Sequence, residues 1–165
     1  MRARELVLGG LFTALSLLIP LVLGPYLRVI VGPFSATLAS HVPLFLGAFI
    51  SPWVGMIVGA ASAFGFLITM GPVIAARAAS HILVGWVAGI ILQRKKPFSL
   101  AILASLPVHA GLEALIVIPF GFSVYDWGLV VGVGTALHHL VDGALALAVI
   151  RLLGLDRLQD WASAA

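Results

Sequence analysis

The chain has 165 residues, of which 62% are hydrophobic and 9% are charged, with nine basic side chains against six acidic ones. A soluble domain has about 25% charged and about 45–50% apolar residues, so this chain lacks the polar surface that contact with water requires. The composition excludes a soluble enzyme, a nucleic-acid-binding protein and a disordered linker. It indicates a multi-pass protein of the cell membrane.

The apolar segments, separated mainly by Gly and Pro, predict an all-α protein with six transmembrane helices in one compact bundle. Because a span needs about 20 residues, six spans leave only short loops, and residues 1–165 form a single domain. The expected helices cover about 5–24, 34–51, 53–70, 73–92, 99–119 and 128–153.

The basic residues predict how this bundle is oriented in the membrane. With both termini in the cytoplasm, Arg28 is the only basic residue in an outer loop. The basic residues then expected on the cytoplasmic side are Arg2, Arg4, Arg94, Lys95, Lys96, Arg151 and Arg157. This asymmetry follows the positive-inside rule, and basic residues at helix ends give no reason to expect a nucleic-acid partner.

Several ionisable side chains fall inside the predicted spans, where each charge costs at least about 2.5–3.5 kcal/mol and usually marks function. They form three pairs spaced i,i+4, so that the members of each pair share one helix face. The pairs are Arg77 with His81, His109 with Glu113, and His138 with Asp142, and His41 and His139 lie in the same depth range.

These residues predict a polar pocket that opens to the outside. Arg77 has the donor fork that suits a carboxylate. The other expected ligand-binding residues are Glu113, His41, His81, His109 and His138, with Tyr125 and Trp127 near the outer face to sandwich a flat ring. A simpler interpretation is that Arg77 pairs with Glu113 and only joins two helices, that each histidine is a packing residue, and that Asp142 fixes His138 or His139.

Small residues four positions apart predict close helix contacts. Such pairs are Gly10 with Ala14, Gly55 with Gly59, Gly85 with Gly89, and Gly128 with Gly132.

The sequence lacks the motifs of an energy-coupling or hydrolytic site. It contains no Gly-Lys pair and therefore no P-loop, and neither HExxH nor GxSxG occurs. The absence of cysteine excludes thiolate-bound zinc. We therefore expect no enzyme activity, no cofactor and no bound metal, and a binding subunit that depends on a separate motor.

The chain resembles the substrate-binding S-components of energy-coupling factor (ECF) vitamin transporters, most closely the niacin-specific branch. The resemblance covers most of the chain. It is carried by Arg2-Ala-Arg4 before Leu11-Phe-Thr-Ala-Leu15, Gly32-Pro-Phe-Ser-Ala-Thr-Leu-Ala-Ser-His41-Val-Pro, Ala48-Phe-Ile-Ser-Pro52, Arg77-Ala-Ala-Ser-His81, and His109-Ala-Gly-Leu-Glu113-Ala-Leu-Ile-Val-Ile-Pro-Phe120.

The resemblance implies a six-helix protein that is not an enzyme and that captures a vitamin, here niacin, from outside the cell. Uptake would need a transmembrane coupling protein and two ATPase subunits. Small residues of the first helix would contact the coupling protein, here Gly10 and Ala14, and the loop over about 24–33 would act as a lid. We expect Arg77 to bind the carboxylate of nicotinate, and a histidine or Glu113 to bind its ring nitrogen.

Three alternatives stay open at this point. The chain could be an S-component for another small heterocyclic substrate. Its five histidines could instead ligate haem or a transition-metal ion. It could also be an assembly subunit of the membrane that binds no ligand.

Overall fold

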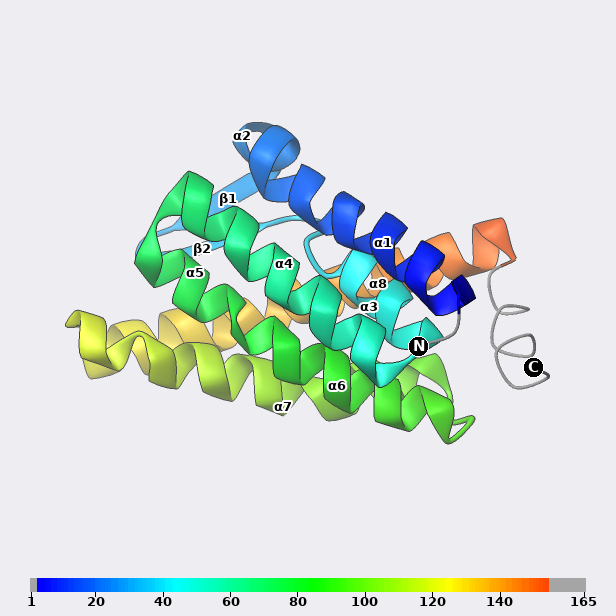
Figure 1. Ribbon diagram of the computed structural model, residues 1–165. Helices are drawn as coiled ribbons and strands as arrows, with labels where there is room; N and C mark the ends of the chain where they lie inside the picture. The colour runs from blue at the N-terminus through cyan, green and yellow to red at the C-terminus, as the bar shows by residue number, and fades with distance from the viewer. Residues whose placement is uncertain (1–2, 155–165) are drawn as a thin grey trace.

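The computed structural model describes residues 3–154, which are predominantly helical. The long helices run side by side along one axis (Figure 1). The start of the first helix and the end of the last lie at one end of the bundle, and a small β-hairpin lies at the other.

The N-terminal helix is longer and less regular than expected. Its parts are α1 (Ala3–Leu18), the π-helical η1 (Ile19–Leu23) and the one-turn helix α2 (Gly24–Leu27). Pro20 is the second residue of the π-helical stretch. A proline has no N–H to donate to the α-helical ladder, which accounts for the change of pitch at this point.

A β-hairpin stands where the sequence predicted the start of the second helix. Its strands are β1 (Arg28–Val31) and β2 (Phe34–Thr37), which pair antiparallel with Val31 opposite Phe34. Gly32 has φ +56° in the two-residue turn, where a type II′ turn needs a positive φ at its first position. The prediction of a helix over 34–51 is therefore wrong for its first eight residues.

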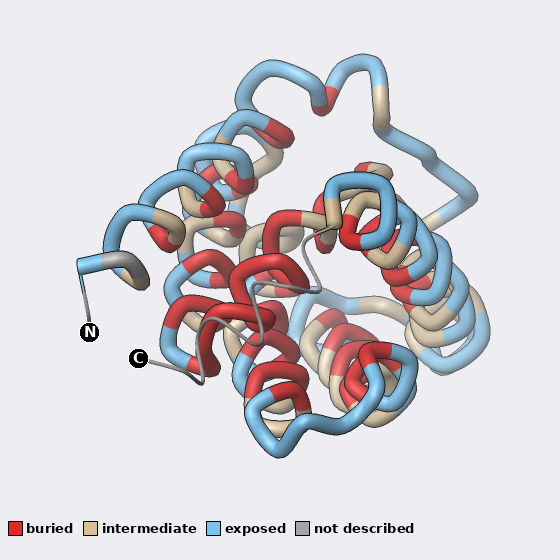
Figure 2. The backbone as a smooth tube through the Cα atoms, turned by 90° about the vertical axis from the view of Figure 1, so that its right-hand side faces the viewer, coloured by how far each residue is buried: buried red, intermediate tan, exposed pale blue. Residues whose placement is uncertain are grey.

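Only α3 (Val42–Ile50) remains of that predicted helix, and it is the central element of the fold. Every residue from Pro43 to Ile50 is buried, and the helix contacts α1, α4, α6 and α8. Figure 2 shows this concentration of buried backbone toward the middle of the bundle. A helix that is apolar on all sides must be buried, which explains why α3 is enclosed by its neighbours.

Glycines bring two of these neighbours into backbone contact. α4 (Pro52–Met70) packs along α6 (Ser80–Gln93), which follows the short α5 (Pro72–Ala78) after a break at Ala79. A Cβ at Gly55 would lie 2.7 Å from the carbonyl oxygen of Gly85, closer than real contacts allow. The predicted small-residue contacts are confirmed for these helices. Around Gly128, by contrast, a Cβ would meet nothing within 4 Å.

The C-terminal half supplies the remaining wall of the bundle. It consists of α7 (Phe98–Ile116), the 3-10 turn η2 (Ile118–Phe120), the π-helical η3 (Tyr125–Val131) and α8 (Gly132–Leu153).

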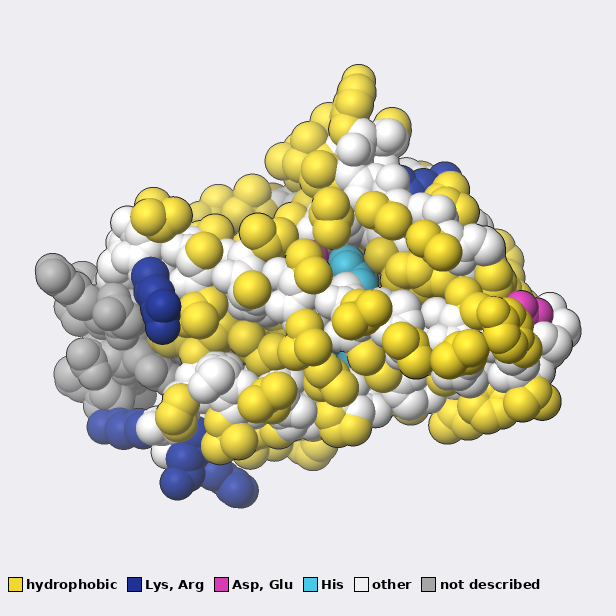
Figure 3. Space-filling view, turned by 180° about the vertical axis from the view of Figure 1, so that it is seen from behind, with side chains coloured by type: hydrophobic (Ala, Val, Ile, Leu, Met, Phe, Trp, Pro, Cys, Tyr) yellow, Lys and Arg dark blue, Asp and Glu magenta, His cyan; other side chains and the backbone are white. Residues whose placement is uncertain are grey.

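Five described segments are long and apolar enough to cross a membrane. They are Glu5–Leu27, Pro52–Met70, Pro72–Gln93, Phe98–Phe120 and Tyr125–Leu153. The nine residues of α3 extend only about 14 Å, less than half of the hydrocarbon core of a bilayer. The surface in Figure 3 is mostly hydrophobic, with Lys and Arg gathered mainly at one end, as expected of a multi-pass membrane protein.

Candidate functional site

A polar cavity lies beneath the β-hairpin, at the end of the bundle opposite the start of α1. Its walls come from the hairpin and from α4 to α8. The side chains that line it include Arg28, Ser35, Phe66, Arg77, His81, Glu113 and His138. The cavity has a volume of about 380 Å³ including its mouth.

Arg77 and Glu113 form a buried ion pair in the floor of the cavity. Nε and Nη2 of Arg77 donate to Oε2 of Glu113 at 3.0 and 2.7 Å, and both side chains are almost fully buried. The hydroxyl of Thr135 on α8 donates to the same oxygen at 2.7 Å. The predicted pair is confirmed, and three donors on Oε2 identify Glu113 as an ionised hydrogen-bond acceptor.

The hairpin contacts Arg77 through Ser35 and Phe34. Nη2 donates to the carbonyl oxygen of Ser35 at 3.1 Å, and the Phe34 ring centroid lies 5.6 Å from the guanidinium carbon. Among the described residues, Nη1 makes one hydrogen bond, a long one of 3.5 Å to the hydroxyl of Ser35. Nη1 therefore keeps donor capacity that a ligand can use. Sequence reasoning missed Ser35 and Thr135, because a lone hydroxyl on an apolar segment carries no signal.

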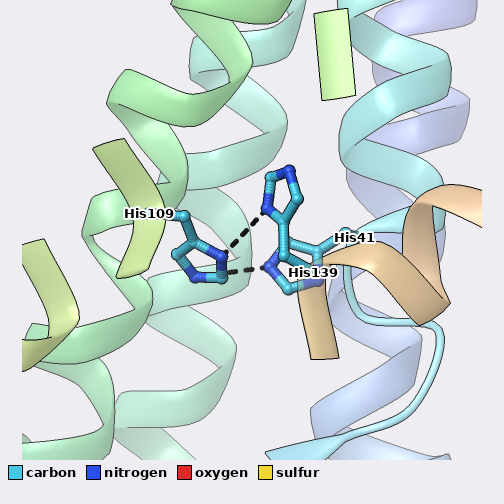
Figure 4. A group of neighbouring side chains, drawn as sticks. All are labelled: His41, His109 and His139. Atoms are coloured by element: carbon cyan, nitrogen blue, oxygen red, sulfur yellow. Dashed lines mark hydrogen bonds between the residues drawn. The ribbon is translucent and has the colours of Figure 1, made fainter. Parts of the chain in front are cut away.

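All five histidines meet beside this ion pair. The ring of His41 is central, with the centroids of His81 and His109 both at 4.5 Å and that of His138 at 4.7 Å. His109 faces His41 and His139 and contacts both (Figure 4). The four histidines expected to bind a ligand, His41, His81, His109 and His138, thus lie close together. His139, for which no ligand-binding role was expected, is fully buried beside them.

Asp142 has a different role from the one expected. Its carboxylate accepts from the backbone N–H groups of Ala39 and His41 at 2.8 and 3.0 Å, and from Nδ1 of His41 at 2.8 Å. It thus fixes the turn before α3, in which Ala39 has a positive φ of 67°. The predicted contact with His138 is longer, 3.6 Å, and no contact with His139 is present among the described atoms.

One curated relative shares most of this chain. The chain is 32% identical over 169 residues to the niacin transporter NiaX of Lactococcus lactis subsp. cremoris (strain MG1363), covering 92% of this chain and 75% of the relative. The chain belongs to the niacin-type S-components of ECF transporters. The S-component is accordingly a transport protein and not an enzyme. No family model and no solved structure matches it.

The predicted aromatic residues lie away from the cavity of the S-component. Tyr125 is 65% exposed on η3, and neither it nor Trp127 lines the cavity. The aromatic side chain in the cavity wall is Phe66 from α4.

Gly10 and Ala14 are exposed on α1, and a Cβ at Gly10 would meet nothing within 4 Å. This surface of the S-component has no partner among the described residues.

His138 separates the polar cavity from an apolar hollow between the hairpin and α8. Its Nε2 lies 3.2 Å from the hydroxyl of Ser40, and its buried Nδ1 has no hydrogen-bond partner among residues 3–154. A buried polar atom without a partner costs about 1–3 kcal/mol, so this nitrogen is ready to bind a ligand atom. Figure 3 shows histidine at the bottom of a hollow on this face.

Proposed function

We propose that the S-component captures nicotinate in the cavity under its hairpin and delivers it to an ECF transport module. The observation that carries this proposal is the buried Arg77–Glu113 pair in the floor of a polar cavity, in a chain related to a niacin transporter. Nicotinate is a flat ring with one carboxylate and one ring nitrogen, so it needs a cation at one end and a hydrogen-bond donor at the other.

The carboxylate of nicotinate binds to the free donors on Nη1 of Arg77. Arg28 on β1 also lines the cavity and is exposed at its rim, where a second guanidinium can close over the same carboxylate. Sequence reasoning assigned Arg28 only to an outer loop. Because charged hydrogen bonds to carboxylates are the strong ones, two arginines favour the acid over its amide.

The ring nitrogen of nicotinate accepts a hydrogen bond from Nδ1 of His138. This assignment is supported by the buried, unpartnered state of Nδ1. Glu113 is a poor choice for this role, because its carboxylate already accepts from Arg77 and Thr135. Phe66 and Met70 offer apolar contact to the ring faces.

In the membrane, the chain crosses with both termini in the cytoplasm, α3 completes the six-helix bundle from inside, and the cavity opens outward. The exposed Arg94, Lys95, Lys96 and Arg151 support this orientation through the positive-inside rule. The hairpin of β1 and β2 acts as the lid.

A coupling protein docks on the exposed face of α1 around Gly10 and Ala14, and two ATPases drive the cycle. This step is taken from the resemblance to other S-components, and the exposed small residues are compatible with it.

Calorimetry of the purified protein in detergent tests the capture step, with nicotinamide as the uncharged comparison. We expect saturable binding of nicotinate, weaker binding of nicotinamide, and at least 100-fold weaker nicotinate binding after Arg28→Ala. An Arg28→Lys variant should recover part of the loss. Equal affinity for nicotinate and nicotinamide, in protein that melts cooperatively, would exclude carboxylate recognition.

A further inference from the structure

The hydrogen bonds around His41 and His139 determine where each ring carries its proton. Asp142 and the carbonyl oxygen of Ile102 can only accept. His41 therefore donates to Asp142 from Nδ1, at 2.8 Å, and keeps a lone pair on Nε2. His139 donates to Ile102 from Nε2, at 3.0 Å, and keeps a lone pair on Nδ1.

The proton position on His139 in turn determines which nitrogen of His109 carries its proton. Nδ1 of His109 lies 3.1 Å from the lone pair on Nδ1 of His139, so His109 donates there and its own Nε2 carries a lone pair. That Nε2 lies 3.4 Å from Nε2 of His41 and 3.2 Å from Oε1 of Glu113. With the rings neutral, three hydrogen-bond acceptors thus face one another with no hydrogen between them, an arrangement that a bound cation would stabilise.

His81 on α6 supplies a further ring nitrogen. Its Nδ1 faces the hydroxyl of Ser62 at 3.3 Å, which leaves Nε2 as the free ring nitrogen. Its ring centroid lies 4.5 Å from that of His41 and 5.1 Å from that of His109. Ligand atoms of His81, His109 and Glu113 lie within 4.8 Å of one another. These three groups come from α6 and α7 and face one another, whereas the ligand atom of His41 groups with those of His109 and His139.

We propose that His81, His109 and Glu113 bind one divalent transition-metal ion of the zinc class in the floor of the cavity. A tetrahedral ion with bonds of about 2.0 Å separates its ligand atoms by about 3.3 Å, which matches the 3.2 Å between Nε2 of His109 and Oε1 of Glu113. This inference departs from the sequence-based expectation of no bound metal and takes up the alternative that histidines ligate a transition-metal ion.

The surrounding contacts are those that metal ligands require. A metal-binding imidazole donates its other N–H to a carboxylate, a carbonyl or a similar acceptor, which fixes its tautomer. Here His139 accepts from His109, and Ser62 lies beside His81. Thr135 and Arg77 hold the other oxygen of Glu113.

The balance of buried charges also supports a divalent ion at this site. The part of this argument that includes bound nicotinate rests on the proposed function. The buried charges of the described chain at this site are Arg77, Glu113 and Asp142, with a sum of one negative charge. A divalent ion changes the sum to one positive charge, and the carboxylate of nicotinate then makes it zero. Without the ion, the buried groups and the bound anion would sum to two negative charges, of which Arg28 at the rim could compensate only one, and the remaining buried charge is costly.

The test measures metal binding and nicotinate binding separately. Protein freed of any polyhistidine tag and treated with EDTA is titrated with Zn²⁺, and with Co²⁺ for its visible absorption. We expect one ion per chain and the strong visible bands of tetrahedral Co²⁺. We expect His81→Ala to weaken Zn²⁺ binding at least 100-fold, and Ser62→Ala to weaken it about 10-fold.

His138→Gln is the matched control, because His138 lines the same cavity outside the ligand set. It should keep the ion while losing nicotinate affinity. Folded wild-type protein that binds no ion, or equal loss of the ion in His138→Gln and His81→Ala, would overturn the proposed site and indicate a proton shared by His109 and Glu113. Nicotinate binding that is unchanged by EDTA would refute the metal's part in ligand binding and leave the proposed function intact. Metal binding without nicotinate binding would refute the proposed function and leave the metal site intact.

Discussion

Replacing Gly59 by alanine tests whether the contact of α4 with α6 positions the binding site. A Cβ at Gly59 would lie 2.6 Å from the carbonyl oxygen of His81, whereas ordinary van der Waals contact begins at 3.4 Å. The two helices would have to separate by about 0.8 Å to relieve the clash. Because the clash is with the backbone of His81, its imidazole would move with it.

Two opposed terms set the size of the effect on stability. Alanine is the better helix former by about 1 kcal/mol. Overpacking a close contact costs about 1–3 kcal/mol. Gly111→Ala on α7 isolates the first term, since Gly111 is exposed and its Cβ would meet nothing within 4 Å. The difference in unfolding free energy between the two variants is then the packing cost, about 2 kcal/mol.

Thermal melting in detergent, followed by nicotinate titration, measures both consequences. For a chain of this size, 2 kcal/mol corresponds to about 4–8 °C, so Gly59→Ala should melt below Gly111→Ala by that interval. It should also bind nicotinate at least 10-fold more weakly, while Gly111→Ala binds as wild type does. A Gly59→Ala protein with the melting temperature and affinity of Gly111→Ala would refute the role of this contact in placing His81.

Two further predictions concern the side chains of the site. Glu113→Leu leaves the Arg77 guanidinium buried without its partner and should lower the unfolding free energy by about 3–5 kcal/mol. The double variant Arg77→Met with Glu113→Leu should regain most of that stability and still fail to bind nicotinate. A double variant that melts no higher than Glu113→Leu would contradict this prediction. His138→Gln should reduce the preference for nicotinate over benzoate, which lacks the ring nitrogen, by about 5- to 150-fold, the equivalent of one buried donor. Titration of both acids measures that ratio, and an unchanged ratio would assign the ring nitrogen to another group.

The i,i+4 spacing correctly predicted a shared helix face for His109 with Glu113 on α7 and for His138 with Asp142 on α8. Arg77 and His81 instead lie on α5 and α6, on either side of the break at Ala79. Apolar surroundings require charged groups to find partners. The sequence therefore indicated both the ion pair and the cluster of imidazoles before the fold was known.

Tertiary contacts decided what the spacing left open. The partner of Asp142 is the turn before α3, about a hundred positions earlier in the chain, which no local pattern can indicate. His138 and His139 point about 100° apart on a helix, yet both face protein, because different neighbours cover the two directions. The hairpin replaced the expected helix start because Gly32 and Pro33 favour a tight turn, and its strands are too short to show alternation.

The carboxylate that holds the start of α3 has a consequence for biogenesis. The N–H groups of Ala39 and His41 find their acceptor on the last helix, 103 and 101 residues further along the chain. Backbone donors left without an acceptor in an apolar interior cost several kcal/mol each, and α3 alone is too short to be inserted as a stable span. While the ribosome is still synthesising the chain, residues 28–50 must therefore wait at the membrane interface. The central helix can settle into the bundle only when α8 has emerged, so a nascent chain truncated before Asp142 should remain sensitive to protease around residues 28–50.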